Sequence, residues 1–542
     1  MNIILISIAV ILIITVYYFV QKEILSRKLK QLRKSWGKIP EKTLDIESVK
    51  IFLNLKNTSS INSGYCIDND TWNDLNLDEI FTIINRTTTP TGAQCLYYLL
   101  RNPVIKEEIL HDREDLINSF SKNQNLREKV QLTIQNLIGD GSKYIPYSLW
   151  TPLPEKPSYT KCFPFISFIS LAVLFLVIFH ILNFMVLIPI FIINYIIRSF
   201  VKKEMKIFIL SFQNLGLLIS TAEKVSALEF DEIKRIRATL KKNIKKTKVI
   251  AKKMAILQFN DTSGLLEYIK IFFLWDVTGF YSSIDKIEKN IGELREIYEI
   301  VGYMDALISV ASFRKDFPRH CKPLFYENID NFIVNDIYNP LLKDPVPNSF
   351  KFENKNLIIT GSNMSGKTTF LRTIGANAVL AQTINTVLAE KYSAPFFNVI
   401  SSIGRDDDII QGKSYYLAEV ESILRLLNAS ESDTIHLFIL DEIFRGTNSV
   451  ERFAASIEVL NYLANDKDFN LVATHDLQLC EKLNNKYKNF HFQEKVCDDG
   501  LSFDYKIHPG ISTSRNAIAL LKYVGYPESI VENAYNRINI KI

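Results

Sequence analysis

The clearest chemistry in this 542-residue sequence lies in a glycine-rich run, TGSNMSGKTTF, between an apolar strand-like segment and a helix-like segment. Gly361, Gly366, Lys367 and Thr368 fit the pattern G-x-x-x-x-G-K-[ST]. In this pattern the glycines let backbone N–H groups surround phosphate oxygens, the lysine reaches the outer phosphates and the hydroxyl holds Mg²⁺. The spacing predicts a loop that binds ATP and Mg²⁺, and the alternative is an ordinary Gly/Ser turn.

Two further strand ends carry side chains suited to hydrolysis. The apolar run HLFIL ends in Asp441 and Glu442, and LVAT is followed by His475. An aspartate at this position can hold Mg²⁺ through water beside Thr368, and the adjacent glutamate can orient and deprotonate the attacking water. We predict Glu442, Lys367 and His475 as catalytic residues, and Thr368 and Asp441 as the Mg²⁺ site. The alternatives are two exposed acids after a buried strand and a structural histidine.

Four segments of the C-terminal part share their motifs with one known family. TGSNMSGKTTFLRTIG is similar to T-G-P-N-M-x-G-K-S-T-x-L-R, with Ser362 in place of Pro and Thr368 in place of Ser. DEIFRGTNS is similar to D-E-I-G-R-G-T-S, with Phe444 in place of Gly, and ATHD is similar to A-T-H. DDIIQGKSYYLAEV matches D-D-x-x-x-G-x-S-T-F-x-x-E-M and places Ser414 at a helix start, which can bind an anion. The chain thus resembles the ATPase domain of the MutS DNA mismatch-repair proteins.

The resemblance implies a fold, a cofactor and an assembly. The expected fold is an α/β P-loop NTPase domain, preceded by a mainly α-helical region that resembles the core and lever of that family. The implied assembly is a homodimer in which Ser414 of one subunit faces the phosphates held by Lys367 of the other. Val346 and Tyr505 are expected beside the adenine. The full set of expected ATP contacts is Gly361, Ser362, Asn363, Met364, Ser365, Gly366, Lys367, Thr368, Thr369, Ser414, Val346 and Tyr505.

Two long uncharged runs predict about three transmembrane helices. Residues 3–20 are long enough to cross a hydrocarbon core of about 30 Å, and 163–197 can form two shorter spans joined near His180 and Asn183. Basic residues flank both runs, and they favour a multi-pass protein of the cell (inner) membrane with its ATPase domain in the cytoplasm. The alternatives are a cleaved signal peptide for the first run and a buried soluble hairpin for the second.

These features divide the chain into five predicted parts. Its composition also limits the kinds of site that these parts can hold. We expect an N-terminal transmembrane helix (1–21), a cytoplasmic helical domain (22–160), a transmembrane hairpin (163–200), a cytoplasmic core-like and lever-like helical region (204–334) and the ATPase domain (335–542). The six cysteines lie far apart without a C-x-x-C pair, which favours a reducing compartment and argues against zinc and a disulfide framework. A net charge of +5 indicates no general polyelectrolyte role.

A basic segment, KRIRATLKKNIKKTKVIAKK, has ten Lys or Arg and no acid among its twenty residues. Lys241, Lys242, Lys245 and Lys246 at its centre are candidates for contact with DNA phosphates or with an anionic membrane surface. A solvated helix face is the third possibility. Double-stranded DNA, if it binds, should show no mismatch preference, because the Phe-x-Glu mismatch-reading domain of the family has no counterpart in this sequence.

The function predicted from these features is that of a membrane-anchored MutS-family ATPase, Mg²⁺-dependent, acting in DNA mismatch repair or mismatched-DNA binding. The alternative is an ATP-driven conformational switch at the membrane that acts on a protein or lipid partner and has no role on DNA.

Overall fold

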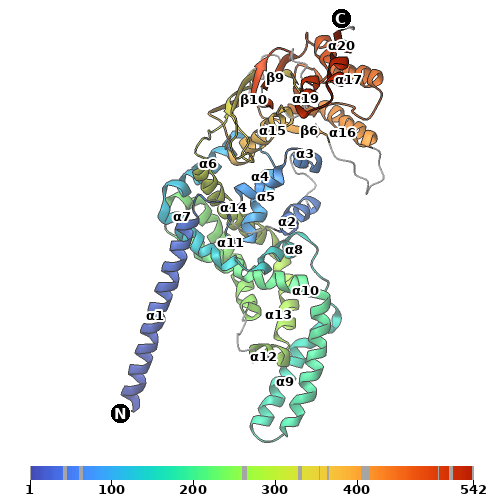
Figure 1. Cartoon of the computed structure of the whole chain (residues 1–542). Coiled ribbons are helices and arrows are strands. Elements are labelled where there is room, and N and C mark those ends of the chain that lie inside the picture. Colours follow the sequence, from blue (N-terminus) through green and yellow to red (C-terminus); the bar gives the residue numbers. More distant parts are fainter. Residues whose placement is uncertain are drawn as a thin grey trace. The chain divides into compact units, whose positions relative to one another are not determined.

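The computed structural model describes residues 2–40, 45–59, 65–258, 265–326, 332–352, 355–362, 365–404, 415–497, 500–511 and 517–539. The chain divides into two compact units (Figure 1). The helical unit comprises Met1–Ser63, Ile83–Tyr98 and Asp115–Asp316, and the α/β unit comprises Gly64–Thr82, Leu99–Glu114 and Phe317–Ile542. A mainly helical region followed by a region of mixed sheets confirms the predicted architecture at this level, and the domain boundaries drawn from the sequence stay predictions.

The helical unit is built from long helices. Their bounds are α1 (Asn2–Ser35), α2 (Ile46–Ser59), α7 (Gln124–Ile134), α8 (Ile145–Trp150), α9 (Phe163–Ile178), α10 (Leu187–Ser226), α11 (Lys234–Gln258), α12 (Leu265–Phe273), α13 (Trp275–Lys289) and α14 (Ile291–Asp316). Three more helices contribute residues to both units: α4 (Leu77–Ile84), α5 (Pro90–Arg101) and α6 (Glu107–Lys122).

A buried carboxylate organises the start of α5. Asp305 of α14 accepts hydrogen bonds from the backbone N–H groups of Thr88 and Thr89, at 3.0 and 2.9 Å, and from the Thr89 hydroxyl at 2.7 Å. Burial raises the pKa of Asp305. A Cβ at Gly92 would lie 2.2 Å from the Asp305 carboxylate, so only glycine fits there. The TTTPTG sequence thus forms a tight helix start around a side chain more than 200 residues away.

Three helical segments of the described chain are long and apolar enough to cross a membrane: Ser158–Ile178, Phe184–Lys203 and Met205–Ser226. The first two contain α9 and the first part of α10, and they are only 11% and 17% buried, as the predicted hairpin requires. The third lies in the region expected to be cytoplasmic, is 50% buried and follows a break in helical backbone at Met205. We assign this third segment to the core of the helical unit, because a membrane span would leave more of its surface exposed.

The N-terminal span predicted from the sequence lies within α1. Side chains from Ile11 to Val20 are exposed along this helix. The other end of α1 is held by Arg33, which donates to both carboxylate oxygens of Glu128 at 2.7 and 2.9 Å. The Arg127 guanidinium also lies 3.8 Å from the centre of the Trp36 ring. The C-terminal end of α1 is therefore anchored in the helical unit, and the passage of this helix through a membrane stays a prediction.

The α/β unit contains two sheets with helices between the strands. The strands are β1 (Leu324–Phe325), β2 (Phe332–Ile337), β3 (Asn348–Phe352), β4 (Asn356–Thr360), β5 (Lys391–Ala394), β6 (Asn398–Ile403), β7 (His436–Asp441), β8 (Phe469–Ala473), β9 (Lys488–Cys497) and β10 (Gly500–Pro509). The helices that belong wholly to this unit are α3 (Asn69–Asp74), α15 (Lys367–Ile384), α16 (Tyr415–Ser430), α17 (Ser449–Leu463), α18 (Leu477–Lys482), α19 (Ala517–Val524) and α20 (Glu528–Asn539).

The larger sheet has the order β10-β9-β4-β8-β7-β6. All neighbouring strands from β9 to β6 are parallel, and β10 is antiparallel to β9. Every residue of β4, β7 and β8 is buried, as expected of central strands of a sheet covered on both faces. The carboxyl ends of these three strands meet at one edge, which is where ligands bind in open α/β sheets. The smaller sheet has the order β1-β5-β2-β3.

Candidate nucleotide-binding site

A cavity of about 630 Å³ lies in the α/β unit beside the glycine-rich loop. The loop connects β4 to α15, and the cavity extends from it to side chains around β3 and β10. Its lining residues are Ile337, Tyr338, Asn339, Leu342, Lys343, Asp344, Val346, Asn348, Ser362, Gly366, Lys367, Thr368, Thr369, Phe370, Thr373, Glu442, Arg445, Phe492 and Tyr505. The structure thus gathers most of the residues that the sequence assigned to ATP.

The glycine-rich loop has a backbone that only glycine adopts readily at two points. Gly361 has φ +147° and Gly366 has φ +103°. The Lys367 ammonium donates to the carbonyls of Gly361 at 2.6 Å and Ser362 at 2.9 Å, so it is held inside the loop. Burial lowers the pKa of Lys367. Ser365, between the two glycines, is buried and its hydroxyl oxygen has no hydrogen-bond partner.

Thr368 and Asp441 meet at the first turn of α15. The Thr368 hydroxyl donates to Oδ2 of Asp441 at 2.5 Å. Asp441 is 5% exposed, and its other oxygen, Oδ1, is buried without a hydrogen-bond partner. Burial raises the pKa of Asp441, although Thr368 and Arg445 oppose that shift. A hydroxyl, a carboxylate and an unsatisfied carboxylate oxygen are the hard oxygen donors that Mg²⁺ prefers, so these residues fit the predicted ion.

Glu442 is held between a guanidinium and an imidazole side chain. Its Oε2 lies 3.0 Å from Arg445 Nε and 3.1 Å from His475 Nδ1. Burial alone would raise the pKa of Glu442, but the hydrogen bond from His475 and the charge of Arg445 lower it below its usual value. The same hydrogen bond raises the pKa of His475. His475, which follows the end of β8, is therefore in contact with Glu442. The backbone of Glu442 is left-handed, with φ +50°.

The outer wall of the cavity is held by an asparagine that the sequence did not single out. The Asn348 amide donates to the carbonyls of Tyr505 at 2.9 Å and Val346 at 3.3 Å, and its oxygen accepts from the backbone N–H of Ile507 at 2.8 Å. Asn348 thereby fixes the two residues expected beside the adenine. Tyr338 also lines the cavity without having been predicted. No sequence signal marks these positions, whereas Arg445 stands inside the quoted DEIFRGTNS segment.

The loop after β7 shows why the family motif has glycine where this chain has Phe444. Phe444 has φ +60°, a backbone conformation that favours glycine, and its ring is buried. Glu419 of α16 supports the loop by accepting a hydrogen bond from the Arg445 backbone N–H at 3.1 Å. Burial raises the pKa of Glu419. The motif residue Glu419 therefore supports the loop that carries Arg445.

Some predicted site residues lie elsewhere. Asn363, Met364 and Ser414 lie outside the described residues. The four lysines predicted to contact DNA or membrane, Lys241, Lys242, Lys245 and Lys246, lie on α11 of the helical unit. Lys246 forms an ion pair with Glu293 at 2.5 Å, and the nearby Lys248 pairs with Glu223 at 3.1 Å.

The fold and the site define an α/β domain with a candidate phosphate-binding loop at the carboxyl ends of parallel strands. Comparison with known proteins bears on the resemblance. Residues 357–540 match the family model described as MutS domain V. The match covers about a third of the chain, and for this region it confirms the resemblance seen in the motifs.

Several relatives carry the name DNA mismatch repair protein MutS. The protein of Natronomonas pharaonis is 26% identical over 289 residues, which cover 52% of this chain and 32% of that protein. The protein of Thermus thermophilus is 29% identical over 261 residues, covering 47% and 31%. That of Clostridium tetani is 30% identical over 276 residues, covering 48% and 31%. The chain thus spans about a third of the length of these relatives.

Proposed function

We propose that this chain is a membrane-anchored, Mg²⁺-dependent ATPase of the MutS type, with its P-loop formed by residues 361–368. The observation that carries the proposal is the buried Oδ1 of Asp441, which has no hydrogen-bond partner and lies 3.8 Å from Arg445 Nη2, beside the Thr368 hydroxyl and one residue before Glu442. A buried carboxylate oxygen without a partner is costly, and a bound cation relieves that cost.

The residues of the chain divide the work as follows. Mg²⁺–ATP supplies a phosphoryl group whose negative charge must be neutralised during transfer to water. Lys367 would exchange the carbonyls of Gly361 and Ser362 for phosphate oxygens, and Thr368 with Asp441 would hold the ion. Glu442 would orient the attacking water and accept its proton. The hydrogen bond from His475 keeps Glu442 ionised. His475 also lies close enough to respond to a change in the charge of Glu442.

The proposed site is completed by a second copy of the chain. The MutS motifs imply that Ser414 of the other subunit faces the phosphates held by Lys367, so hydrolysis should require a homodimer. Val346 and Tyr505, fixed by Asn348, would form the adenine side of the cavity.

We also propose that the ATPase domain is cytoplasmic, with the N-terminus and the turn near His180–Asn183 on the outer side. The exposed apolar surfaces of α9 and the first part of α10 support insertion of the hairpin. Labelling of single cysteines with an impermeant reagent in intact cells tests this topology. Labelling at position 36 from outside would contradict it.

Duplex DNA without mismatch preference is the proposed partner, because the matched relatives carry the name of DNA mismatch repair proteins. The second candidate is a conformational switch at the membrane with no DNA role. Ion pairs of Lys246 with Glu293 and of Lys248 with Glu223 favour that candidate, because they neutralise part of the basic face of α11.

The decisive experiment measures ATP binding and hydrolysis by the full chain in lipid nanodiscs. Lys367→Ala should abolish ATP binding, because the ammonium contacts the phosphates of bound ATP. Lys391→Ala, an exposed lysine of the same unit, is the matched control and should bind normally. Normal ATP binding by Lys367→Ala would overturn the proposal.

The same preparation separates the two partners. ATPase rates are measured with matched and mismatched duplexes over a series of salt concentrations. A DNA role predicts stimulation by both duplexes that falls steeply with salt. A rate indifferent to DNA at low salt would favour the switch, and a preference for the mismatch would contradict the expected lack of a reading element.

A further inference from the structure

Polar side chains inside the apolar hairpin face α12. Asn194 of α10 donates to the Ser170 hydroxyl at 3.1 Å and to the carbonyl of Phe272 at 2.5 Å. The Ser167 hydroxyl donates to the carbonyl of Phe273 at 2.6 Å. Asn194 and Ser170 are almost fully buried. The last carbonyls of a helix have no partner within it, so the hairpin satisfies two of these groups at the end of α12.

A charged cluster marks the edge of the hairpin. Arg198 donates to Asp276 at 2.7 Å and is also paired with Glu267 of α12, and Lys202 lies 3.5 Å from Asp276. The segment 163–197 before Arg198 has no formal charge. If the hairpin enters the bilayer, Arg198 and Lys202 therefore lie at the membrane–water boundary.

Part of α12 lies on the apolar side of that boundary. The Tyr268 ring packs 6.1 Å, centre to centre, from Phe191. Phe191 precedes Arg198 by seven residues, or about 10 Å along a helix. Figure 1 shows α12 beside α9, at the part of the helical unit where the hairpin begins. The Tyr268 end of α12 therefore reaches the depth of the acyl chains.

The length of α12 excludes a membrane crossing. Nine residues extend about 14 Å, less than half of the roughly 30 Å hydrocarbon core. A short helix with apolar residues on one side and charged residues near the boundary is typical of an interfacial helix. This differs from the expectation that all of 204–334 lies in the cytoplasm.

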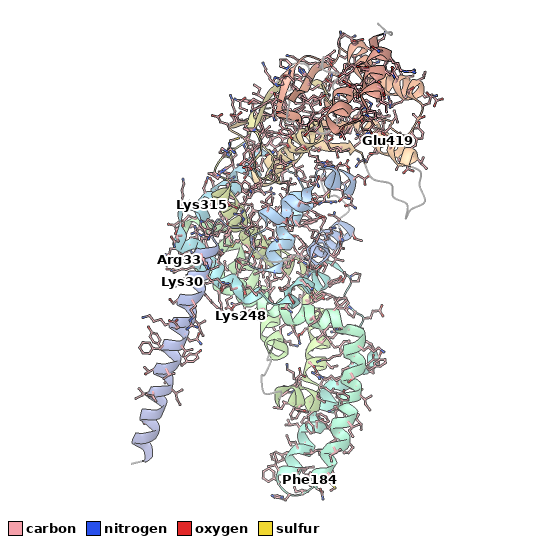
Figure 2. All side chains as sticks on the ribbon, in the orientation of Figure 1. Lys30, Arg33, Phe184, Lys248, Lys315 and Glu419 are labelled. Carbon is pink, nitrogen blue, oxygen red and sulfur yellow. The ribbon has the colours of Figure 1, made fainter. Side chains whose placement is uncertain are left out.

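A groove of about 450 Å³ runs between α12 and the hairpin. Its nine lining residues are all apolar or aromatic, among them Leu174, Leu187, Ile188 and Tyr268. Phe184, which also lines it, lies at the free end of the hairpin (Figure 2). Ile188 is 54% exposed and Tyr268 is 62% exposed, so the groove opens onto the same surface as the outward face of the hairpin.

We propose that α12 is an interfacial membrane helix and that its groove with the hairpin binds one acyl chain of a bilayer phospholipid. The inference rests on the proposed insertion of the hairpin. The occupant follows from position, because an apolar groove beside a membrane-inserted hairpin is in contact with acyl chains, which match its lining. The polar bonds of Ser167 and Asn194 hold α12 against the hairpin and so keep the groove in place.

The first test uses the full chain in vesicles of phosphatidylethanolamine and phosphatidylglycerol, with photoreactive benzoylphenylalanine at single positions. Tyr268→benzoylphenylalanine should form a phospholipid adduct on illumination. Phe168, exposed on α9, reports on the hairpin itself, and Tyr462, similarly exposed on α17, is the water-facing control. Adducts at 168 but not at 268 would overturn the inference and leave hairpin insertion intact. Absence at both positions would overturn both.

The second test asks whether the groove retains a lipid. Native mass spectrometry of the detergent-purified full chain should find one bound phospholipid per chain. Ile188→Trp fills the groove and should lose that lipid, whereas Ile192→Trp, one helical turn along and outside the groove, should keep it. Equal retention by both variants, or no retained lipid in the unmodified chain, would contradict the groove as a lipid site.

The Asn194→Ala variant tests whether the polar hydrogen bonds position α12 against the hairpin. Loss of the bond to Phe272 should lower the adduct yield at position 268 several-fold, because α12 is no longer held against the hairpin. Tyr195→Ala, on the neighbouring exposed position, should leave the yield unchanged. An unchanged yield with Asn194→Ala would show that apolar packing alone positions α12.

Discussion

Two buried charge clusters, one in each unit, differ in whether their polar atoms are satisfied. In the α/β unit, Lys367, Glu442 and Arg445 line the cavity, and Asp441 and His475 form ion pairs with Arg445 and Glu442 respectively. Asp441 Oδ1 has no hydrogen-bond partner, and Arg445 Nη2 lies 3.8 Å from it. In the helical unit, Arg198 meets Asp276 and Glu267, and within the described chain no buried nitrogen or oxygen of these three side chains is without a partner.

The difference separates a binding site from a structural ion pair. A satisfied cluster has already repaid the desolvation of its charges and gains nothing from a ligand. An unsatisfied one in a cavity retains donors and acceptors that a ligand can complete. Burial and charge alone would rank the two clusters together, and only the orphaned oxygen distinguishes them.

The largest expected effect is the loss of hydrolysis in Glu442→Gln. The amide cannot accept the proton of the attacking water, so kcat should fall by about 10²–10⁴-fold while ATP binding remains. Single-turnover hydrolysis and equilibrium binding are measured on the same preparation. Glu458→Gln, an exposed glutamate of α17, is the control and should be normal. A normal rate in Glu442→Gln would remove this residue as the base.

Disruption of the satisfied cluster around Arg198 should lower the stability of the protein. Asp276→Leu leaves Arg198 buried beside a single exposed partner, and it should lower the free energy of unfolding by about 3 kcal/mol. Denaturant unfolding of the full chain in detergent measures this loss. Asp285→Leu, on the same helix, breaks an exposed pair with Lys156 and should cost about 1 kcal/mol or less. Equal effects would mean that burial does not distinguish the two pairs.

Disruption of the unsatisfied cluster around Asp441 should lower the affinity for Mg²⁺. Asp441→Asn removes the charge that faces the predicted ion, and it should weaken Mg²⁺-dependent ATP binding about 10–100-fold, as the loss of an indirect metal partner does. Titration of Mg²⁺ at fixed ATP is the measurement. Asp433→Asn, an exposed residue shortly before β7, should leave the titration unchanged. An unaffected titration in Asp441→Asn would leave the orphaned oxygen without a ligand.

The smallest effect is a shift in pH dependence. His475 lowers the pKa of Glu442 against the effect of burial, so His475→Gln should raise that pKa and move the acid limb of the kcat profile to higher pH. The pair itself is fully charged between the ordinary glutamate pKa of 4.5 and the ordinary histidine pKa of 6.5, and its histidine charge is lost as pH rises through the raised pKa of His475. His111→Gln, an exposed residue of α6, is the control. An unshifted limb would indicate that Arg445 alone sets the charge of Glu442.

Local patterns made much of the α/β unit predictable. The strands β7 and β8 are short apolar runs followed by polar residues, and parallel pairing brings their carboxyl ends to one edge. Asp441, Glu442 and His475 could therefore be placed together from the sequence. Asn348 could not, because its role depends on the register that brings Tyr505 to it across 157 residues.

The helical unit was less predictable because its important contacts are distant in sequence. The apolar spacing of Tyr268, Ile269 and Phe272 indicates an amphipathic helix. It does not indicate which part of the protein or membrane contacts the apolar side of that helix. Lys246 belonged to a run without acids, yet its counter-charge, Glu293, lies 47 residues away. A run of like charges in the sequence shows the local composition of a helix. It does not show which residues of other helices neutralise those charges.

The separation of Arg198 from its partners has a consequence for biosynthesis. Glu267 and Asp276 follow Arg198 by 69 and 78 residues. A ribosome adds roughly 5–20 residues per second, so for several seconds the hairpin would lack the carboxylate partners of Arg198 and the bond from Asn194 to the Phe272 carbonyl. Insertion of the nascent hairpin should therefore be reversible at first and become permanent only when α12 and α13 emerge. A chain arrested before residue 265 should be extractable from membranes under conditions that leave the complete chain in place.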